Sequence, residues 1–340
     1  MLRNQRLKNQ NPKIAVIGGG SWATAIVKIL TDNGYRVKWW MRNSESIKYI
    51  NTYHRNPRYL SSLQLNLKRC KVISNLKRTI RFSDILIVAI PAAFIDDAFS
   101  TCNPKVLKKR QVVSAIKGMT SDENQIMSEY FSKKFELPKN NFFVLGGPSH
   151  AEEVARERLS YLTFAGQNNK DTKAIADLFA NRYIKTSISN DVIGIEYAEV
   201  LKNVIAVASG ICHGLGYGDN FQSVLVSNAV QEINRFIQKV HPLATRDINK
   251  SVYLGDLLVT AYSQFSRNRT FGNMIGKGYT VKSAQVEMDM VAEGYYATKS
   301  IFEINKDLGV KMPITHAVYN ILYEKVAPGL EISILADELA

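Results

Sequence analysis

The feature that most constrains the fold is a glycine-rich turn between an apolar segment and a helical one, at residues 13–30. Residues 14–17 form an uninterrupted apolar run, which is typical of a strand buried on both faces. Three glycines and Ser21 follow at once, and residues 22–30 have a helical pattern. A strand, a glycine turn and a helix in this order are the context of a dinucleotide-binding fingerprint. The stretch therefore predicts a nucleotide site, with a plain strand–helix turn as the alternative.

Each small residue of this turn has an expected role. Gly18 makes the tight turn, and Gly20 lets the backbone approach a pyrophosphate. Ala23 takes the third small position, where the helix meets the strand. The helix N-terminus then offers unpaired N–H groups and a positive dipole end to the phosphates.

The end of the second expected strand, at residues 36–40, indicates which cofactor binds. An acidic residue at this place would bind the ribose 2′-hydroxyl and favour NAD. The sequence instead continues with Met41, Arg42 and Asn43. A guanidinium suits a 2′-phosphate, so Arg42 predicts NADPH (NADP), with NADH (NAD) as the second candidate. A plain solvated arginine is the alternative interpretation.

Further apolar runs at residues 85–90, 112–116 and 142–145 are separated by helix-length stretches. This pattern predicts an α/β fold with a Rossmann-type, mostly parallel sheet and helices on both faces. From Val192 onward the pattern is helical. We therefore expect a basic tail at residues 1–12, an NAD(P)-binding domain at 13–190, and an all-α substrate-binding and catalytic domain at 191–340.

Two lysines and one basic cluster are candidates for catalysis or for binding the substrate. Lys202 interrupts an apolar helix at residues 196–208, where desolvation would lower its pKa and prepare it for proton transfer. A structural ion pair with Glu199, one turn earlier, is the alternative. Lys117 lies just beyond the carboxyl end of an expected buried strand, where ligands bind in sheets of this kind. Contact with a ligand and plain exposure to solvent are the two interpretations of this lysine. Residues 266–269 combine a hydroxyl, an amide and two arginines, as a phosphate site does.

Composition excludes several classes of protein. No apolar run approaches the roughly 18 residues of a spanning helix. The three cysteines are scattered along the chain, so we expect no disulfides and a protein of the reducing cytoplasm. The five histidines lack the spacing of metal ligands, so we expect no metal site. The net charge of +14 is spread along the chain, which favours anionic small ligands or plain solubility over nucleic acid.

Seven short motifs occur in the order found in one enzyme family. They are the glycine turn at residues 18–24, Lys117-Gly118, Gly147-Pro148-Ser149, Lys202-Asn203, Gly255-Asp256-Leu257, Ser266-Arg267-Asn268-Arg269 and Glu293-Gly294, the last expected in a turn between helices. Over residues 13–323 the chain resembles NAD(P)-dependent sn-glycerol-3-phosphate dehydrogenases of the bacterial soluble type.

The resemblance implies reversible reduction of dihydroxyacetone phosphate to sn-glycerol 3-phosphate, which supplies glycerophospholipid synthesis. It implies that Lys202 transfers the proton, assisted by Lys117 and Asp256. The implied substrate site consists of Lys117, Gly147, Ser149, Lys202, Asp256, Ser266, Arg267 and Asn268. The implied cofactor contacts are Ser21, Trp22, Arg42, Lys117, Ala151, Arg267, Val291 and Glu293, in addition to the glycine turn.

Other functions remain as alternatives. Another two-domain Rossmann dehydrogenase, of the β-hydroxyacid type, would also use a lysine and an asparagine, but would not need the basic cluster at residues 266–269. A non-catalytic NADPH-binding sensor would leave the lysine in the apolar helix unexplained. We expect a small phosphorylated substrate, no nucleic acid, no transmembrane segment, and a homodimer through the helical domain.

Overall fold

The computed structural model describes residues 11–288 and 292–339, and the chain divides into two compact units. Unit 1 comprises the residues up to 90, together with 94–116 and 127–192. Unit 2 comprises residues 91–93 and 117–126 and the chain from residue 193 onward. Two short segments that follow strands of unit 1 therefore belong to unit 2, and one of them begins with Lys117.

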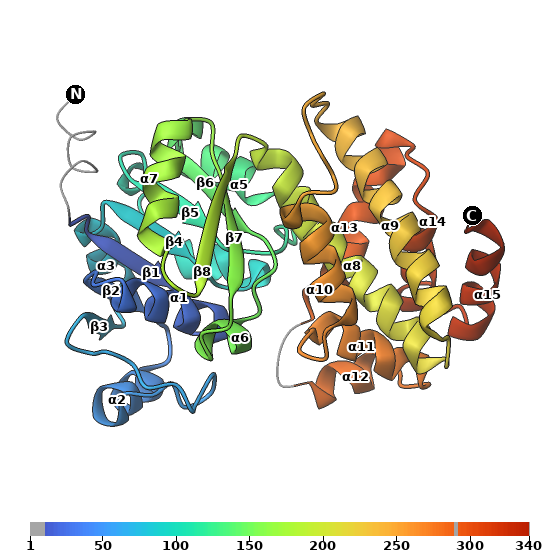
Figure 1. Cartoon of the computed structure of the whole chain (residues 1–340), viewed down its shortest axis with the longest axis horizontal. Coiled ribbons are helices and arrows are strands. Elements are labelled where there is room, and N and C mark those ends of the chain that lie inside the picture. The colour runs from blue at the N-terminus through green and yellow to red at the C-terminus, as the bar shows by residue number, and fades with distance from the viewer. Residues whose placement is uncertain (1–10, 289–291, 340) are drawn as a thin grey trace. The chain divides into compact units, whose positions relative to one another are not determined.

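Unit 1 is built around an eight-stranded sheet with the strand order β3-β2-β1-β4-β5-β6-β7-β8 (Figure 1). Neighbouring strands are parallel except for β6 and β7, which are antiparallel. The strands are β1 (Ile14–Ile17), β2 (Val37–Trp40), β3 (Cys70–Ile73), β4 (Ile85–Val88), β5 (Gln111–Ser114), β6 (Phe142–Gly146), β7 (Ser160–Ala165) and β8 (Ile184–Ser189). The expected mostly parallel sheet is confirmed.

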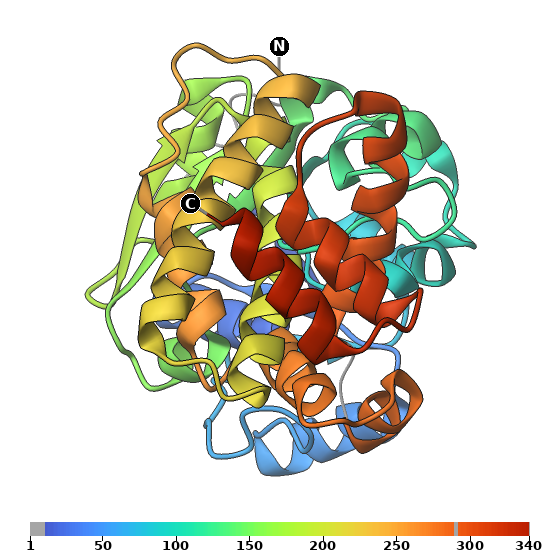
Figure 2. The same cartoon turned by 90° about the vertical axis from the view of Figure 1, so that its right-hand side faces the viewer.

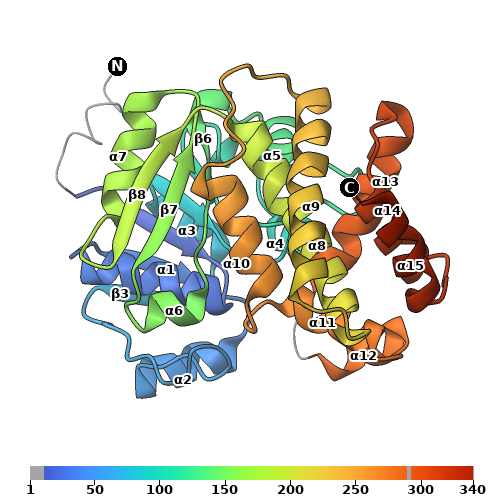
Figure 3. The same ribbon diagram turned by 45° about the vertical axis from the view of Figure 1, so that its right-hand side comes forward.

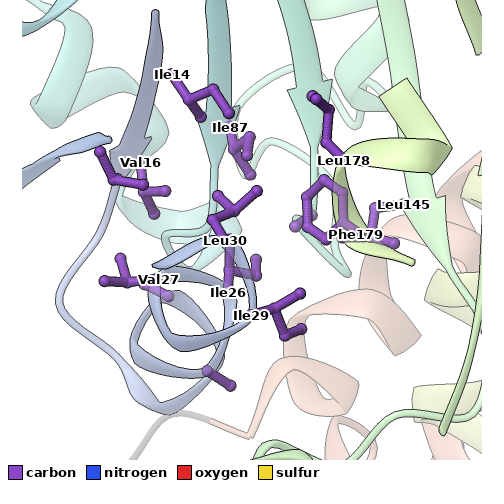
Figure 4. Packing of buried hydrophobic residues seen from close by; sticks show 14 of the residues in the cluster. Ile14, Val16, Ile26, Val27, Ile29, Leu30, Ile87, Leu145, Leu178 and Phe179 are labelled. Atoms are coloured by element: carbon purple, nitrogen blue, oxygen red, sulfur yellow. The ribbon is translucent and has the colours of Figure 1, made fainter. Parts of the chain in front are cut away.

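Helices cover both faces of this sheet because adjacent strand residues point to opposite sides. On one face, α1 and α7 bring Leu30 and Phe179 into the same core as Ile87 of β4 (Figure 4). On the other face, the ring of Phe131 in α5 lies 5.9 Å from that of Phe142 in β6. The helices of unit 1 are α1 (Ser21–Asp32), α2 (Ser44–Tyr53), α3 (Leu76–Phe82), α4 (Ile95–Phe99), α5 (Met127–Phe135), α6 (Ala151–Ala155) and α7 (Asn169–Phe179).

Three strands, β3, β7 and β8, were not expected from the sequence. β3 and β8 form the two edges of the sheet, and both β3 and β7 place exposed side chains, Lys71 and Tyr161, beside buried ones. Strands with one solvated face have no uninterrupted apolar run, which is the signal that identified the central parallel strands. The sheet is therefore larger than expected, although its class is unchanged.

Unit 2 is helical, as expected, and Figures 2 and 3 show its helices from two sides. Its helices are α8 (Val192–Gly214), α9 (Asp219–Val240), α10 (Asp256–Tyr262), α11 (Arg267–Gly276), α12 (Val281–Glu287), α13 (Glu293–Leu308), α14 (Pro313–Leu322) and α15 (Pro328–Glu338), with a π-helical turn at Ser251–Gly255. Every residue of α8 from 194 to 212 is buried, so α8 is the central helix of this unit. Among residues 11–288 and 292–339, no helix combines the length and the apolar character needed to span a membrane.

Helices α8 and α11 approach each other closely because glycines lie where they meet. A Cβ added at Gly210 of α8 would lie 2.1 Å from the carbonyl oxygen of Arg269. A Cβ added at Gly272 of α11 would lie 2.1 Å from the carbonyl oxygen of Val207. The two backbones are thus in direct contact, which holds the start of α11 against the middle of α8.

Replacing Gly272 by alanine is expected to destabilise the protein by about 3 kcal/mol, because the added methyl group forces two backbones apart. The drop in melting temperature of Gly272→Ala measures this effect. Gly329→Ala in α15 is the matched control, since a Cβ there meets only the end of a leucine side chain at 4.0 Å. The helix propensity of alanine should leave the control unchanged or slightly stabilised. Equal melting temperatures of the two variants would contradict the close approach.

Candidate active site

The glycine turn after β1 has a conformation that a side chain at residue 18 would not allow. Gly18 has a φ of +131°, and a Cβ there would lie 2.1 Å from the carbonyl oxygen of Ala89. Two side chains hold the turn from outside. The indole Nε1 of Trp39 donates a hydrogen bond of 2.6 Å to the Gly18 carbonyl, and Asn56 Nδ2 donates one of 3.1 Å to the Gly19 carbonyl. Asn56 was not predicted as a site residue; its only sequence signal is the turn-like pair that it forms with the following proline.

The N-terminus of α1 suits an anionic ligand. Gly20 is the N-cap residue, and no side chain at that position caps the helix. A Cβ added at Gly20 would meet nothing within 4 Å, and residues 21–24 of the first turn are not acidic. The backbone at Gly20 therefore borders open space beside the positive end of the helix dipole, which suits the binding of a pyrophosphate. Ser21 and Trp22, two predicted cofactor contacts, are the first residues of this helix and are half-buried.

Arg42, the predicted partner of a 2′-phosphate, is the second residue after the end of β2 and is exposed. Its guanidinium lies 5.7 Å from the centre of the Phe94 ring, within the range of a cation–π contact. The next residue, Asn43, accepts a hydrogen bond of 2.7 Å from the backbone N–H of Ser46 and so caps α2. The strand end thus presents a guanidinium where a carboxylate would select NAD.

The remaining predicted residues of unit 1 follow β6. A Cβ at Gly147 would lie 2.8 Å from the carbonyl oxygen of Tyr161, so this position accommodates only glycine. The Ser149 hydroxyl donates a hydrogen bond of 2.9 Å to the Gly147 carbonyl, and Ala151 is the first residue of α6. Gly147 and Ser149 therefore belong to unit 1, whereas the other predicted substrate contacts belong to unit 2.

Four charged side chains meet in unit 2: Lys117, Glu199, Lys202 and Asp256, which we call the charged quartet. Lys202 Nζ lies 2.5 Å from Glu199 Oε2 and donates a hydrogen bond to Asp256 Oδ2. Lys117 Nζ lies 3.4 Å from Glu199 Oε2 and 4.0 Å from Asp256 Oδ2. Three of the side chains are no more than 4% exposed, and that of Lys117 is 27% exposed. The quartet brings together the three residues predicted for catalysis.

Local structure explains how these groups meet. Glu199 and Lys202 are three residues apart in α8 and therefore lie on the same face of that helix. Asp256 is the first residue of α10 and directly follows the π-helical turn, a feature often found at functional sites. Lys202 also lines a small cavity whose other walls are mainly apolar, among them Ile233 and Leu257. The ion pair and the desolvated lysine, which the sequence offered as alternatives, thus occur together.

The surroundings shift the proton affinities in opposite directions. Burial lowers the pKa of Lys202, although Asp256 and Glu199 act against this effect. Burial raises the pKa of Glu199, and the nearby carboxylate of Asp256 raises it further. Burial alone would raise the pKa of Asp256, but the ammonium groups of Lys117 and Lys202 hold it well below its usual range. Burial alone would lower the pKa of Lys117, but the two carboxylates raise it. Burial thus favours the neutral forms of Lys202 and Glu199, while the two carboxylates act to keep Lys202 charged.

A chain of amide hydrogen bonds connects the quartet to α11 and α13. Asn203 Nδ2 donates to the backbone carbonyl of Lys117 at 2.8 Å, and Asn268 Nδ2 donates to Asn203 Oδ1 at 2.9 Å. Asn268 Oδ1 accepts the backbone N–H of Gly294 at 2.9 Å. Both asparagines are buried, so losing either would leave buried polar groups unsatisfied. Asn203 was not among the predicted site residues, and its only signal was its place beside Lys202.

The basic cluster forms the N-terminus of α11. Ser266 is the N-cap residue, and its hydroxyl accepts a hydrogen bond of 3.3 Å from the backbone N–H of Arg269. Arg267 is the first residue of the helix and is exposed. A guanidinium beside a helix N-terminus attracts a phosphate both by charge and through N–H donors.

Glu293 is the first residue of α13, which corrects the expectation that it lies in a turn between helices. A carboxylate is favourable there because the helix N-terminus is positive. Glu293 Oε1 accepts the backbone N–H of Ala92 at 3.1 Å, and a Cβ at Gly118 would lie 2.7 Å from Oε2. Burial raises the pKa of Glu293 to about 7. Val291, another predicted cofactor contact, lies outside the described residues.

Comparisons with known proteins show to which family the chain belongs. The family model described as NAD-dependent glycerol-3-phosphate dehydrogenase N-terminus matches residues 13–172, and the model of the C-terminus of the same enzyme matches residues 191–332. The chain is 38% identical over 315 residues to a glycerol-3-phosphate dehydrogenase [NAD(P)+] of Staphylococcus haemolyticus, covering 92% of this chain and 94% of that relative. A Staphylococcus aureus enzyme of the same name is 36% identical over 318 residues.

Solved structures agree as well. The crystal structure of glycerol-3-phosphate dehydrogenase from Coxiella burnetii superposes with a TM-score of 0.90 at 26% identity, covering 96% of this chain and 99% of that one. D-mandelate dehydrogenase in complex with NADH, at 16% identity and a TM-score of 0.58, shares the fold alone. These comparisons do not favour the alternatives of a β-hydroxyacid dehydrogenase or a sensor. The chain belongs to the NAD-dependent glycerol-3-phosphate dehydrogenase family.

Proposed function

We propose that this oxidoreductase uses NAD(P)H to reduce dihydroxyacetone phosphate to sn-glycerol 3-phosphate, reversibly, with Lys202 as the proton donor. The observation that carries the proposal is the charged quartet, in which a buried lysine is held by two carboxylates. The relatives named glycerol-3-phosphate dehydrogenase [NAD(P)+] support the reaction.

The chemistry that bound NAD(P)H supplies is a hydride to the carbonyl carbon, which leaves negative charge on the carbonyl oxygen. Lys202, in its ammonium form, donates a proton to that oxygen. Lys117 stays charged because of its two carboxylate neighbours, and it stabilises the developing oxyanion. Asp256 orients Lys202 through the hydrogen bond that it accepts.

The substrate phosphate is held at the N-terminus of α11. Arg267 supplies charge-assisted hydrogen bonds, Asn268 is fixed by its amide partners, and Ser266 lies at the N-cap. Binding energy from this remote phosphate orients the carbonyl group for reaction. Gly147, Ser149 and Asp256 complete the proposed substrate contacts.

Arg42 gives the proposal a test of cofactor choice. Replacing Arg42 by aspartate should weaken NADPH binding about 10²-fold, since a charge-assisted hydrogen bond contributes about 1.5–3 kcal/mol and the carboxylate adds repulsion. Binding of NADH should be retained or improved. Titrations of both cofactors against wild type and Arg42→Asp measure the effect, and Arg36→Asp is the control for net charge. An unchanged ratio of the two affinities would contradict this role.

The reaction itself is tested by the loss of NADPH absorbance with dihydroxyacetone phosphate, compared with unphosphorylated dihydroxyacetone. Rapid oxidation with the phosphorylated ketone alone is the expected result. Oxidation of both ketones at equal efficiency would contradict the phosphate site. No oxidation with either ketone, although NADPH binds, would contradict the reaction.

The proposal also covers the roles of the two domains, the assembly of the protein and its place in the cell. We take residues 13–190 as the cofactor domain and residues 191–340 as the domain that supplies the proton and binds the phosphate. A homodimer formed through the helical domain, and action in the cytoplasm on behalf of glycerophospholipid synthesis, are part of the proposal.

A further inference from the structure

Glu199 has a position in the charged quartet that the proposed reaction does not yet explain. Its carboxylate lies within 3.4 Å of both lysine ammonium groups and is only 2% exposed. Asp256 already accepts a hydrogen bond from Lys202, so a second carboxylate is not needed to orient that lysine. Among the described residues, the charged groups that face Glu199 are Lys202 on its own helix, Lys117 from the segment at 117–126, and Asp256 from α10.

The net charge of the quartet changes during the reaction. With all four groups ionised, two positive and two negative charges cancel. Donation of a proton by Lys202 would then leave the buried group with a net negative charge, which is costly in a region shielded from water. If one carboxyl is protonated beforehand, the quartet begins with a charge of +1 and ends neutral. A positive quartet also suits the oxyanion that forms on the substrate.

The two carboxyls differ in a way that identifies the proton carrier. The lysines keep Asp256 ionised, whereas burial and the charge of Asp256 favour the neutral form of Glu199. The proton affinity of Lys202 is shifted downward by burial, so the affinities of Lys202 and Glu199 are brought toward each other. The 2.5 Å between Glu199 Oε2 and Lys202 Nζ is short enough for a proton to pass directly between the two groups.

We propose that Glu199 is the proton reservoir of this site and restores the ammonium form of Lys202 after each reduction. The inference rests on the proposed role of Lys202. In the first step an N–H bond of Lys202 breaks and the O–H bond of the product alcohol forms. In the second step the O–H bond of Glu199 breaks and an N–H bond of Lys202 forms again. The Glu199 carboxylate later takes a proton from water, which is the proton that the overall reduction consumes.

If Glu199 is a proton reservoir, its loss should slow the later turnovers and not the first. If Glu199 only forms a structural ion pair, its loss should affect the first turnover as much as the later ones. The variant Glu199→Gln keeps the size and the hydrogen-bonding ability of the side chain but cannot deliver a proton. Lys202 still begins charged in this variant, so the first turnover should proceed at a rate close to that of wild type. Later turnovers should be about tenfold slower, within the usual contribution of acid–base catalysis, because Lys202 must be recharged from solvent. The loss should grow with rising pH, and imidazole should reverse it as a small proton donor.

The experiment is stopped-flow measurement of NADPH oxidation by dihydroxyacetone phosphate, first with enzyme in excess and then with substrate in excess. Glu199→Asp is the matched variant, since it retains a titratable carboxyl and should recover most of the steady-state rate. Infrared spectra in H₂O and D₂O add a readout that needs no turnover. The difference between the spectra of wild type and Glu199→Gln should contain the band of a neutral carboxyl that shifts in D₂O, because other buried carboxyls such as Glu293 contribute equally to both spectra and cancel.

Three results would overturn the inference: a first turnover slowed as much as the later ones, equal rates for Glu199→Gln and wild type at every pH, or no neutral carboxyl band in the difference spectrum of the two proteins. The first result would make Glu199 a positioning residue only. Failure of the proposed function looks different, because wild-type protein would then not oxidise NADPH with dihydroxyacetone phosphate at all.

Discussion

Replacing Lys202 by methionine is expected to lower kcat for reduction of dihydroxyacetone phosphate by about 10³-fold, because the general acid of the reaction is lost. The affinity for NADPH should stay within about twofold, since the glycine turn that we assign to the cofactor lies in unit 1. Methionine preserves most of the buried volume of the lysine. Asp256 keeps Lys117 as a charged partner, and Glu199 can remain neutral, so the fold should tolerate the change.

Steady-state kinetics and NADPH fluorescence titration measure these two effects separately. Lys306→Met is a suitable control, since Lys306 is exposed on α13 and pairs only with Glu303 among the ion pairs found. The control should retain wild-type kcat. Retained turnover in Lys202→Met, with a normal melting temperature, would contradict the assignment of the proton donor.

Replacing Arg267 by leucine is expected to lower kcat/KM for dihydroxyacetone phosphate by about 10²-fold or more, because charge-assisted bonds to the phosphate contribute about 3 kcal/mol. The activity with unphosphorylated dihydroxyacetone should hardly change. Arg267 is exposed at the start of α11, so the loss of its charge should leave stability almost unaltered. The ratio of kcat/KM for the two ketones is the informative quantity, since general damage to the enzyme would affect both.

Two further variants separate the geometry of the Arg267 guanidinium from the overall positive charge of the protein. Arg267→Lys keeps the charge but not the two-pronged geometry of a guanidinium, so it should recover only part of the lost kcat/KM. Lys299→Leu removes one positive charge from an exposed position of α13 and should have no effect. An equal loss in Arg267→Leu and Lys299→Leu would mean that the overall positive field, rather than a phosphate site, attracts the substrate.

The parts of the fold that could be predicted from sequence are those with local signals. The central strands are buried on both faces and therefore appear as apolar runs, and Gly18 marks the turn that no other residue can form. The edge strands β3 and β8 lack this signal because polar residues interrupt their apolar ones. Their pairing depends on neighbours that the local sequence does not reveal.

The sequence named individual residues for the candidate site, but it could not show how they contact one another. Lys202 was noticeable as a charge in an apolar helix, whereas Glu199 was named only as its possible ion-pair partner one turn earlier. The hydrogen bond from Lys202 to Asp256 spans 54 residues and depends on the π-helical turn that precedes α10. Asn56 binds the carbonyl of the glycine turn, and Asn203 binds Asn268. Both contacts likewise depend on tertiary packing that the local sequence does not reveal.

The most direct test follows the hydride and asks whether its transfer depends on Lys202. Wild-type protein and Lys202→Met are incubated with dihydroxyacetone phosphate and NADPH that carries deuterium at both positions of its reactive carbon, and the product is analysed by mass spectrometry. We expect sn-glycerol 3-phosphate with one deuterium on its central carbon from wild type, and almost none from Lys202→Met. Unlabelled product from wild type would contradict the hydride transfer, and equal labelled product from both proteins would contradict the role of Lys202.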